Sequence, residues 1–194
     1  MIDAERSEPQ SPTGKAVGID LGLEFFYTDS EGNQVENPRF HQKAEKSLKR
    51  LQRRASKRKK GSKNRKKAVN KMARKHLKVS RQRREFVVLT ARTLVASGDA
   101  IVYEDLKVPN LVKNHKLAKS ISDAAWSTFT NWVDYFAKIR GVHIVAVAPH
   151  FTSQDCSKCG TRVKKSLSRR THKCPCGLVE HRDLNAAKNI FSKG

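Results

Sequence analysis

Apolar residues recur in two spacings along the chain, and the spacings predict a sheet that is interrupted by a pair of helices. Residues 15–22 (KAVGIDLG) form a short apolar run that ends at a turn, which is typical of a buried strand. Residues 23–30 (LEFFYTDS) and 34–40 (QVENPRF) predict two more strands, joined through the turn signal SEGNQ. Apolar runs at 99–106 (DAIVYEDL) and 142–149 (VHIVAVAP) predict two later strands.

The segment between the third and fourth predicted strands has helical spacing instead. In its first part the apolar residues recur at intervals of three and four: Ala44, Leu48, Leu51 and Ala55. One face of this helix is therefore apolar and can be buried. Residues 61–64 (GSKN) break the pattern, and a second, longer helix is predicted over residues 65–96. The two helices together predict a helical hairpin inserted into the sheet-forming part.

Residues 122–140 predict a further amphipathic helix before the last strand. Ser122 or Asp123 is the expected cap at its start, and Gly141 is the expected stop. The aromatic residues of this helix line one face, so we expect them in the core rather than stacked on nucleic-acid bases. A short final helix is predicted over residues 183–191. The order of strands and helices fits an α/β fold with a mixed sheet flanked by helices.

Charge changes this picture because it is concentrated in the hairpin. The chain has a net charge of +23, and between Arg39 and Arg84 there are 22 Lys or Arg residues against one acid, Glu45. The rest of the chain holds 19 basic and 17 acidic residues. Such a block attracts polyphosphate, and its binding to nucleic acid is favoured by the release of counterions. A solubilising tail or adhesion to an anionic membrane is the alternative, but the helical spacing beneath the charges favours nucleic acid. The predicted nucleic-acid contacts are Arg50, Arg53, Arg54, Lys57, Arg58, Lys59, Lys60, Lys63, Arg65, Lys66 and Lys67.

The four cysteines form two closely spaced pairs. Cys156 and Cys159 make a CxxC followed by Gly160, and Cys174 and Cys176 make a CxC followed by another glycine. Clustered cysteines in a chain with this basic excess indicate zinc rather than secreted disulfides. We expect a closed four-cysteine site, in which zinc is structural because no position is open for catalysis. A redox disulfide and an empty site are the alternatives, and His172 is a reserve ligand.

The sequence shows neither a membrane span nor a secretory signal. No apolar run approaches the ~20 residues that a membrane span needs. The first residues, MIDAERSEPQSPTG, are acidic and contain Pro and Ser but no apolar core, so they are not a secretory signal. We interpret residues 1–14 as a disordered leader and expect a cytoplasmic protein, associated with the nucleoid when bound to DNA.

Acidic residues at the ends of buried strands raise the possibility of metal-dependent phosphodiester hydrolysis. Asp20 ends an apolar strand, where a bare carboxylate is costly unless it binds something, and Gly18 leaves room for a ligand or another backbone. Glu104 closes the later strand, although alternation alone does not decide between it and Asp105. Asp183 is a third candidate, with a helix N-cap as its alternative role. Three carboxylates could hold two Mg²⁺ or Mn²⁺ ions about 4 Å apart.

Several motifs in one order resemble a known family. They are GIDLG, the basic hairpin with KKGSKNR, VYEDL, KLAKSISDAAW, CSKCG and RDLNAAKNI. In this order they resemble TnpB, the OrfB-type transposase family of bacterial insertion sequences, which is related to the type V CRISPR effector nucleases. The resemblance covers nearly everything from Val17 to Ile190.

The resemblance implies a RuvC-like nuclease domain of the ribonuclease H fold, with a long basic helical hairpin and a zinc-ribbon insertion. The implied nuclease domain covers 15–149 plus 181–194, with the hairpin at 39–97 and the ribbon at 150–180. The resemblance implies an RNA-guided DNA endonuclease, with DNA and a guide RNA as partners.

By position, the acidic triad of the family falls on Asp20, Glu104 and Asp183. These three residues are therefore the expected catalytic residues and ligands for Mg²⁺ or Mn²⁺, which selects Glu104 over Asp105. His181 replaces an acid that is frequent at this position in the family, and we do not expect the change to affect metal binding.

Family members are expected to carry an N-terminal half that handles guide RNA and target, whereas this chain begins 19 residues before Asp20. We therefore expect a fragment, a split protein or a shortened reading frame, with a separate N-terminal half as a further partner. The alternatives to a nuclease are a non-catalytic DNA- or RNA-binding regulator and an inactive relic. A transposase that joins DNA strands is a third alternative. Its single-strand mechanism is expected to use a tyrosine, but Tyr27, Tyr103 and Tyr135 all look like strand or core residues.

Overall fold

A five-stranded mixed sheet forms the centre of the computed structural model, which describes residues 7–166 and 168–194. The strand order is β3-β2-β1-β4-β5. The elements are β1 (Ala16–Leu21), β2 (Phe25–Asp29), β3 (Gln34–Glu36), β4 (Ala100–Glu104) and β5 (His143–Val147). Strands β1 and β2 are antiparallel, as are β2 and β3, whereas β1 and β4 are parallel, as are β4 and β5. The predicted α/β fold with a mixed sheet is confirmed.

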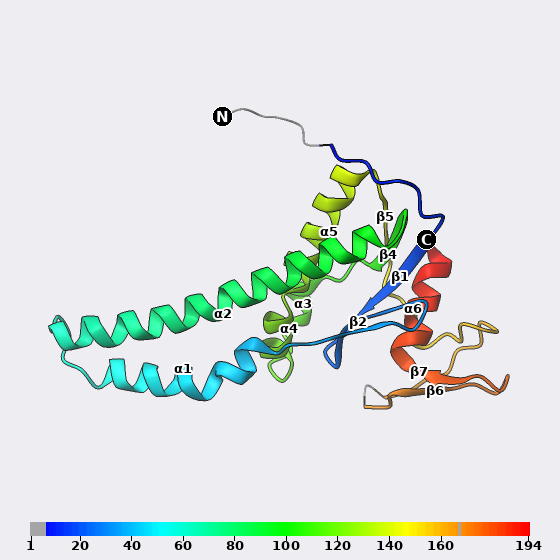
Figure 1. Ribbon diagram of the computed structural model, residues 1–194. Coiled ribbons are helices and arrows are strands. Elements are labelled where there is room, and N and C mark those ends of the chain that lie inside the picture. The colour runs from blue at the N-terminus through cyan, green and yellow to red at the C-terminus, as the bar shows by residue number, and fades with distance from the viewer. Residues whose placement is uncertain (1–6, 167) are drawn as a thin grey trace.

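Helices cover both faces of the sheet (Figure 1). The core on one face is built from the sheet, α2 (Lys63–Ala96) and α5 (Trp126–Arg140). The other face is packed by α6 (Arg182–Lys193), whose Ile190 lies in a buried cluster with Val102. Aromatic residues predicted for the core on the 122–140 segment do lie there, since Trp126 and Phe129 belong to the main cluster. The α6 face is the one that matters for the candidate site.

The hairpin of α1 (Phe40–Ser56) and α2 projects from the sheet as an arm (Figure 1). Near the base of the arm, the two helices share a small buried cluster of Ala44, Leu48 and Val79. Ser62 caps the start of α2, where its side chain accepts a hydrogen bond from the Arg65 N–H. Helix α2 begins two residues earlier than its apolar spacing predicts, because this cap lies just before Lys63.

The segment before β5 differs from its prediction. It forms α3 (Val108–Leu111), α4 (Ala118–Ala124) and then α5 in place of one helix from residue 122. Ala125 separates α4 from α5 with a left-handed backbone at φ 57°. Asp123 does not cap this helix, because its carboxylate accepts hydrogen bonds from the backbone N–H groups of His41 and Gln42 at the start of α1.

The chain between β5 and α6 forms a small lobe with a two-stranded antiparallel ribbon, β6 (Thr171–Lys173) and β7 (Val179–His181). At the other end of the sequence, residues 1–6 of the expected leader lie outside the described residues. Further along that leader, Glu8 donates a backbone hydrogen bond to the Ile139 carbonyl, and Thr13 donates one to Asp99. In the described part of the chain no helix has the length and hydropathy needed to cross a membrane.

Candidate carboxylate and cysteine metal sites

Strand alternation places Asp20 and Glu104 on the face of the sheet that α6 covers. Val17, Ile19 and Leu21 face the main core, so Gly18 and Asp20 point to the opposite face. The parallel register pairs Ile19 with Tyr103, which sets the next residues, Asp20 and Glu104, side by side. Glu104 is buried, whereas the side chain of Asp105 is 53% exposed and pairs with Lys107 at 2.6 Å. The structure therefore turns Glu104, and not Asp105, toward Asp20.

Helix α6 brings Asp183 to the same place. The helix lies close against β1 at Gly18, and a Cβ built on Gly22 would be 3.8 Å from Asp183 Oδ2. Asp183 is 6% exposed and is not the N-cap, because the cap is His181, whose Nδ1 accepts a hydrogen bond from the Asp183 N–H at 3.3 Å. His181 therefore takes the capping role that was the alternative for Asp183.

The electrostatics of the three carboxyl groups reflect this proximity. Burial, followed by the charges of Glu104 and Asp183, raises the pKa of Asp20 well above its usual value. Burial also raises the pKa of Glu104, although a hydrogen bond from Thr152 and the nearby Lys193 partly oppose the rise. Like charges gathered in a buried site repel one another, and a divalent cation would relieve that repulsion.

A tighter group of possible ligands overlaps this site. Glu24, His181 and Asp183 offer ligand atoms that all lie within 4.8 Å of one another. Asp20 and Glu104 are not in that group, so the structure brings the three predicted acids to one face without gathering their oxygens around a single point. Glu24 is also paired with Arg170, whose Nε lies 2.9 Å from Glu24 Oε2. Two ions about 4 Å apart do not require every ligand to be mutually close.

The four cysteines form a second group. Their Sγ atoms lie within 4.8 Å of one another, with Cys156 and Cys176 at 3.7 Å and Cys159 and Cys174 at 3.5 Å. Zinc–sulfur bonds of about 2.3 Å in a tetrahedron require sulfur separations of about 3.8 Å. The glycine after the first pair, Gly160, has a positive φ of 74°, and its N–H donates to the Cys156 carbonyl at 2.8 Å. The donor set and its spacing fit a structural zinc ion.

Protonation at the cysteine cluster differs from one thiol to another. The Thr161 hydroxyl and N–H lower the pKa of Cys159 to about 6, with help from Cys176 and Cys174. The Cys176 N–H lowers the pKa of Cys174, but burial and the neighbouring thiols outweigh it and raise the pKa to about 12. His172 is not among the clustered ligands; it is fully buried, and its Nδ1 contacts Lys165 Nζ.

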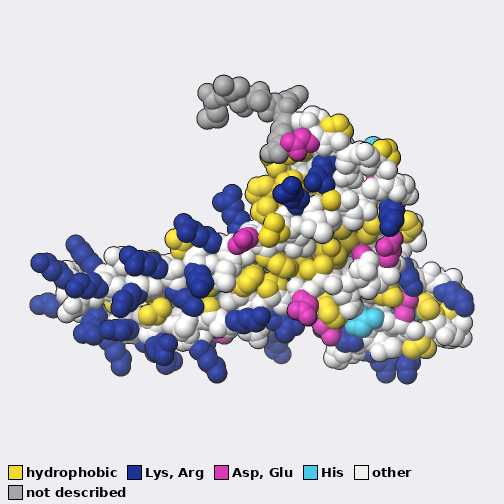
Figure 2. Space-filling model, viewed as in Figure 1, with side chains coloured by type: hydrophobic (Ala, Val, Ile, Leu, Met, Phe, Trp, Pro, Cys, Tyr) yellow, Lys and Arg dark blue, Asp and Glu magenta, His cyan; other side chains and the backbone are white. Residues whose placement is uncertain are grey.

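Lysine and arginine side chains crowd the arm formed by α1 and α2 (Figure 2). All eleven residues predicted to contact nucleic acid lie in this hairpin, and all except Arg65 are exposed. Arg65 instead donates hydrogen bonds to the carbonyls of Ala55 and Arg58, so it closes the end of α1. A pocket of about 370 Å³ between the two helices is lined by Arg54, Arg58, Asn64, Lys67, Ala68, Asn70, Lys71 and Arg74.

The sequence alone did not identify several residues around the carboxylates. Thr152 donates to Glu104, and Arg170 and Arg182 lower the pKa of Asp20. A threonine in the loop after a strand and arginines in a basic chain carry no motif of their own. Glu24 is the one residue of this group that the sequence could have indicated, because it is an acid two residues after the GIDLG motif that contains Asp20.

A mixed sheet with helices on both faces and acids at the ends of β1 and β4 defines an α/β domain, which fits the ribonuclease H-like fold that the motif resemblance implies. The sequence profile of the OrfB family of IS605-type insertion sequences, described as "Probable transposase", matches residues 1–115. The chain belongs to this family, which is the one that its motifs resemble. A second profile, "Cas12f1-like, TNB domain", matches residues 126–190.

Named relatives agree with this family. A Streptomyces pristinaespiralis protein named "Putative RNA-guided DNA endonuclease" is 40% identical over 96% of this chain and 47% of its own length. The Escherichia coli K12 protein named "Putative RNA-guided DNA endonuclease InsQ" is 32% identical over 99% of this chain and 52% of its own length. This chain therefore spans about half the length of the curated relatives that it matches.

Solved structures show the same fold. A Cas12f1 complex with guide RNA and target DNA matches 95% of this chain and 51% of that protein, with a TM-score of 0.67 and 19% identity. A second Cas12f ternary complex matches 97% of this chain and 40% of that protein, with a TM-score of 0.67 and 20% identity.

Proposed function

We propose that this chain is the nuclease domain of an RNA-guided DNA endonuclease and hydrolyses DNA phosphodiesters with divalent metal ions. The observation that carries the proposal is the placement of Asp20, Glu104 and Asp183 on one face of the sheet, beneath a helix that the fold holds against β1. The raised pKa of Asp20 supports it, because three acids are kept together at an electrostatic cost. Such costs are characteristic of functional sites.

The three carboxylates would hold two Mg²⁺ or Mn²⁺ ions, since hard cations prefer oxygen ligands. When bound, the ions supply a nucleophilic hydroxide and neutralise charge on the phosphate and on the leaving oxygen. Asp20 is close enough to both other acids for their charges to raise its pKa, so it would be held as a ligand together with them. Arg182 and Arg170, which already act electrostatically on Asp20, offer positive charge to the DNA backbone.

The hairpin arm and the cysteine lobe have separate roles in this proposal. The exposed cations of α1 and α2 track the phosphate backbone of DNA and of a guide RNA, without base specificity. The four cysteines hold zinc, which stabilises the lobe and takes no part in hydrolysis. Guide pairing would supply the sequence specificity.

A matched pair of substitutions at the end of β4 tests this function. We expect Glu104→Gln to abolish Mg²⁺-dependent cleavage of DNA and Asp105→Asn to leave it unchanged. The assay uses the chain alone, and also with a guide RNA and the part of the Streptomyces relative that this chain does not cover. Full cleavage by Glu104→Gln would refute the proposal. DNA binding without cleavage in any combination would indicate a non-catalytic nucleic-acid-binding protein instead.

A further inference from the structure

A short segment after β5 connects both candidate metal sites. It contains Thr152, which is 4% exposed and whose hydroxyl donates a hydrogen bond to Glu104 Oε1. A few residues later the same segment enters the first cysteine pair at Cys156. One stretch of chain therefore contacts a predicted catalytic carboxylate at one end and a predicted zinc ligand at the other.

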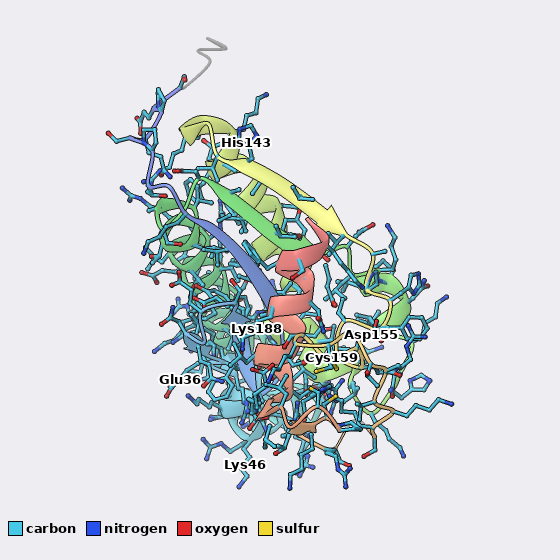
Figure 3. The ribbon with its side chains drawn as sticks, turned by 90° about the vertical axis from the view of Figure 1, so that its right-hand side faces the viewer. Glu36, Lys46, His143, Asp155, Cys159 and Lys188 are labelled. Carbon is cyan, nitrogen blue, oxygen red and sulfur yellow. The ribbon has the colours of Figure 1, made fainter. Side chains whose placement is uncertain are left out.

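Two asparagines of α6 hold this segment. Asn185 is fully buried, its Oδ1 accepts from the Ser157 N–H at 3.0 Å, and its Nδ2 donates to the Asp155 carbonyl at 2.8 Å. Asn189 donates from Nδ2 to the carbonyls of Thr152 and Asp155, at 2.7 and 2.6 Å. Both asparagines lie on α6, the helix that carries Asp183 in its first turn. Figure 3 shows Asp155 beside this helix, on which Lys188 is also labelled.

These bonds close a path between the carboxylates. Glu104 is bound to Thr152, the Thr152 carbonyl is bound to Asn189, and Asn189 belongs to the same helix as Asp183. The two acids come from β4 and α6, which have no covalent connection nearby. Their relative position therefore depends on this polar link as well as on the packing of α6 against the sheet.

We propose that Thr152, Asn185 and Asn189 are positioning residues that fix Glu104 and Asp183 relative to each other for cation binding. The inference rests on the proposed function, because it assumes that these carboxylates bind divalent cations. Groups that hydrogen-bond to metal ligands fix the orientation of those ligands, and their loss typically weakens metal binding about 10- to 100-fold. Thr152 does this directly, by holding one oxygen of Glu104. The two asparagines act by holding the backbone that carries Thr152.

The test measures Mn²⁺ affinity by electron paramagnetic resonance titration of the zinc-loaded chain. Asp20→Ala identifies the binding that belongs to the carboxylates. Thr152→Val removes the hydroxyl with little change in shape, and Thr152→Ser restores it. Thr130→Val is the matched control, because the Thr130 hydroxyl donates to the Ser127 carbonyl of its own helix and to no other group among the described residues. Asn189→Leu removes the link to α6 at a partly exposed position, so the effect does not depend on replacing the fully buried Asn185.

We expect Thr152→Val to weaken Mn²⁺ binding at the carboxylates about 10- to 100-fold and Asn189→Leu to weaken it about tenfold. Thr152→Ser and Thr130→Val should remain close to wild type. A purely structural role would lower the unfolding free energy of Thr152→Val and leave the Mn²⁺ affinity of the folded protein unchanged, and that result overturns the inference. If Asp20→Ala binds Mn²⁺ as well as wild type does, the proposed function itself fails, and the inference fails with it.

Discussion

Gly18 is the point at which the fold of the sheet and the placement of Asp183 can be tested together. A Cβ added at Gly18 would lie 2.6 Å from the Ala187 carbonyl oxygen, 2.6 Å from Phe191 Cβ and 2.7 Å from the Phe191 nitrogen. Ordinary van der Waals contact begins at 3.4 Å, so α6 has to recede by about 0.8 Å to accommodate one methyl group. Two of the three opposing atoms are backbone, which no rotamer change can move.

We expect Gly18→Ala to lower the unfolding free energy by about 2 to 3 kcal/mol, in the upper range for overpacking a buried contact. The same displacement moves Asp183 relative to Asp20 and Glu104. Because active-site misplacements of about 1 Å can cost about 100-fold in rate, we also expect Mn²⁺ affinity at the carboxylates to fall. Urea unfolding followed by tryptophan fluorescence measures the first effect, and the electron paramagnetic resonance titration measures the second.

Gly14→Ala provides the control for replacing a glycine as such. Gly14 has a φ of 70° and no atom within 4 Å of an added Cβ, so its substitution is expected to cost about 1 kcal/mol of backbone strain. It should leave Mn²⁺ affinity unchanged. Wild-type stability in Gly18→Ala would refute the close-contact argument. Lost stability with wild-type Mn²⁺ affinity would show that the position of α6 does not set the carboxylate geometry.

Three further predictions concern the acids, the cysteines and the arm. The raised pKa of Asp20 means that the folded, metal-free protein holds a proton that the unfolded chain releases near its ordinary pKa of about 4, so stability falls as pH rises toward the folded pKa. The unfolding free energy of Asp20→Asn should therefore be about 1 kcal/mol higher than that of wild type at pH 7 without Mg²⁺. A lower unfolding free energy in urea titration would contradict this. Wild-type chain should bind about one zinc ion, and Cys176→Ser should lose it to a chromophoric chelator at lower chelator concentration. Replacing Arg58 and Lys67 with serine should reduce the slope of log affinity for DNA against log salt by about 1.4 to 1.8, whereas Lys138→Ser should not change it.

Local patterns in the sequence predict where the strands and helices lie, but they do not predict which face of a strand carries the site. Apolar runs located the strands, and the periodic hairpin residues located the arm, because both patterns are local. Alternation along one strand left Glu104 and Asp105 undecided, since the face of β4 is set by its register with β1. The observed pairing of Ile19 with Tyr103 settles which acid lies beside Asp20. Register depends on contacts between residues more than 80 positions apart, which no local pattern contains.

Helix caps show the same limit. Asp123 has the chemistry of an N-cap and lies before a helical pattern, yet its carboxylate caps α1 across the molecule. Asp183 also has a capping side chain, but His181 takes that role and leaves Asp183 in the first turn. At the first place tertiary packing decided which helix received the cap, and at the second place a different residue type of the same helix start supplied it.

The order of the elements also explains why the cysteine lobe stands directly before α6. The close contact at Gly18 and the burial of Ile190 hold α6 against the sheet from its inner side. Asn185 and Asn189 bind the segment that leads into Cys156, so the lobe restrains the helix from its outer side. A folded cysteine cluster would make that segment rigid, because four ligands close two loops onto one ion. The lobe would then fix the position of Asp183, and zinc loss should weaken Mn²⁺ binding before it unfolds the sheet.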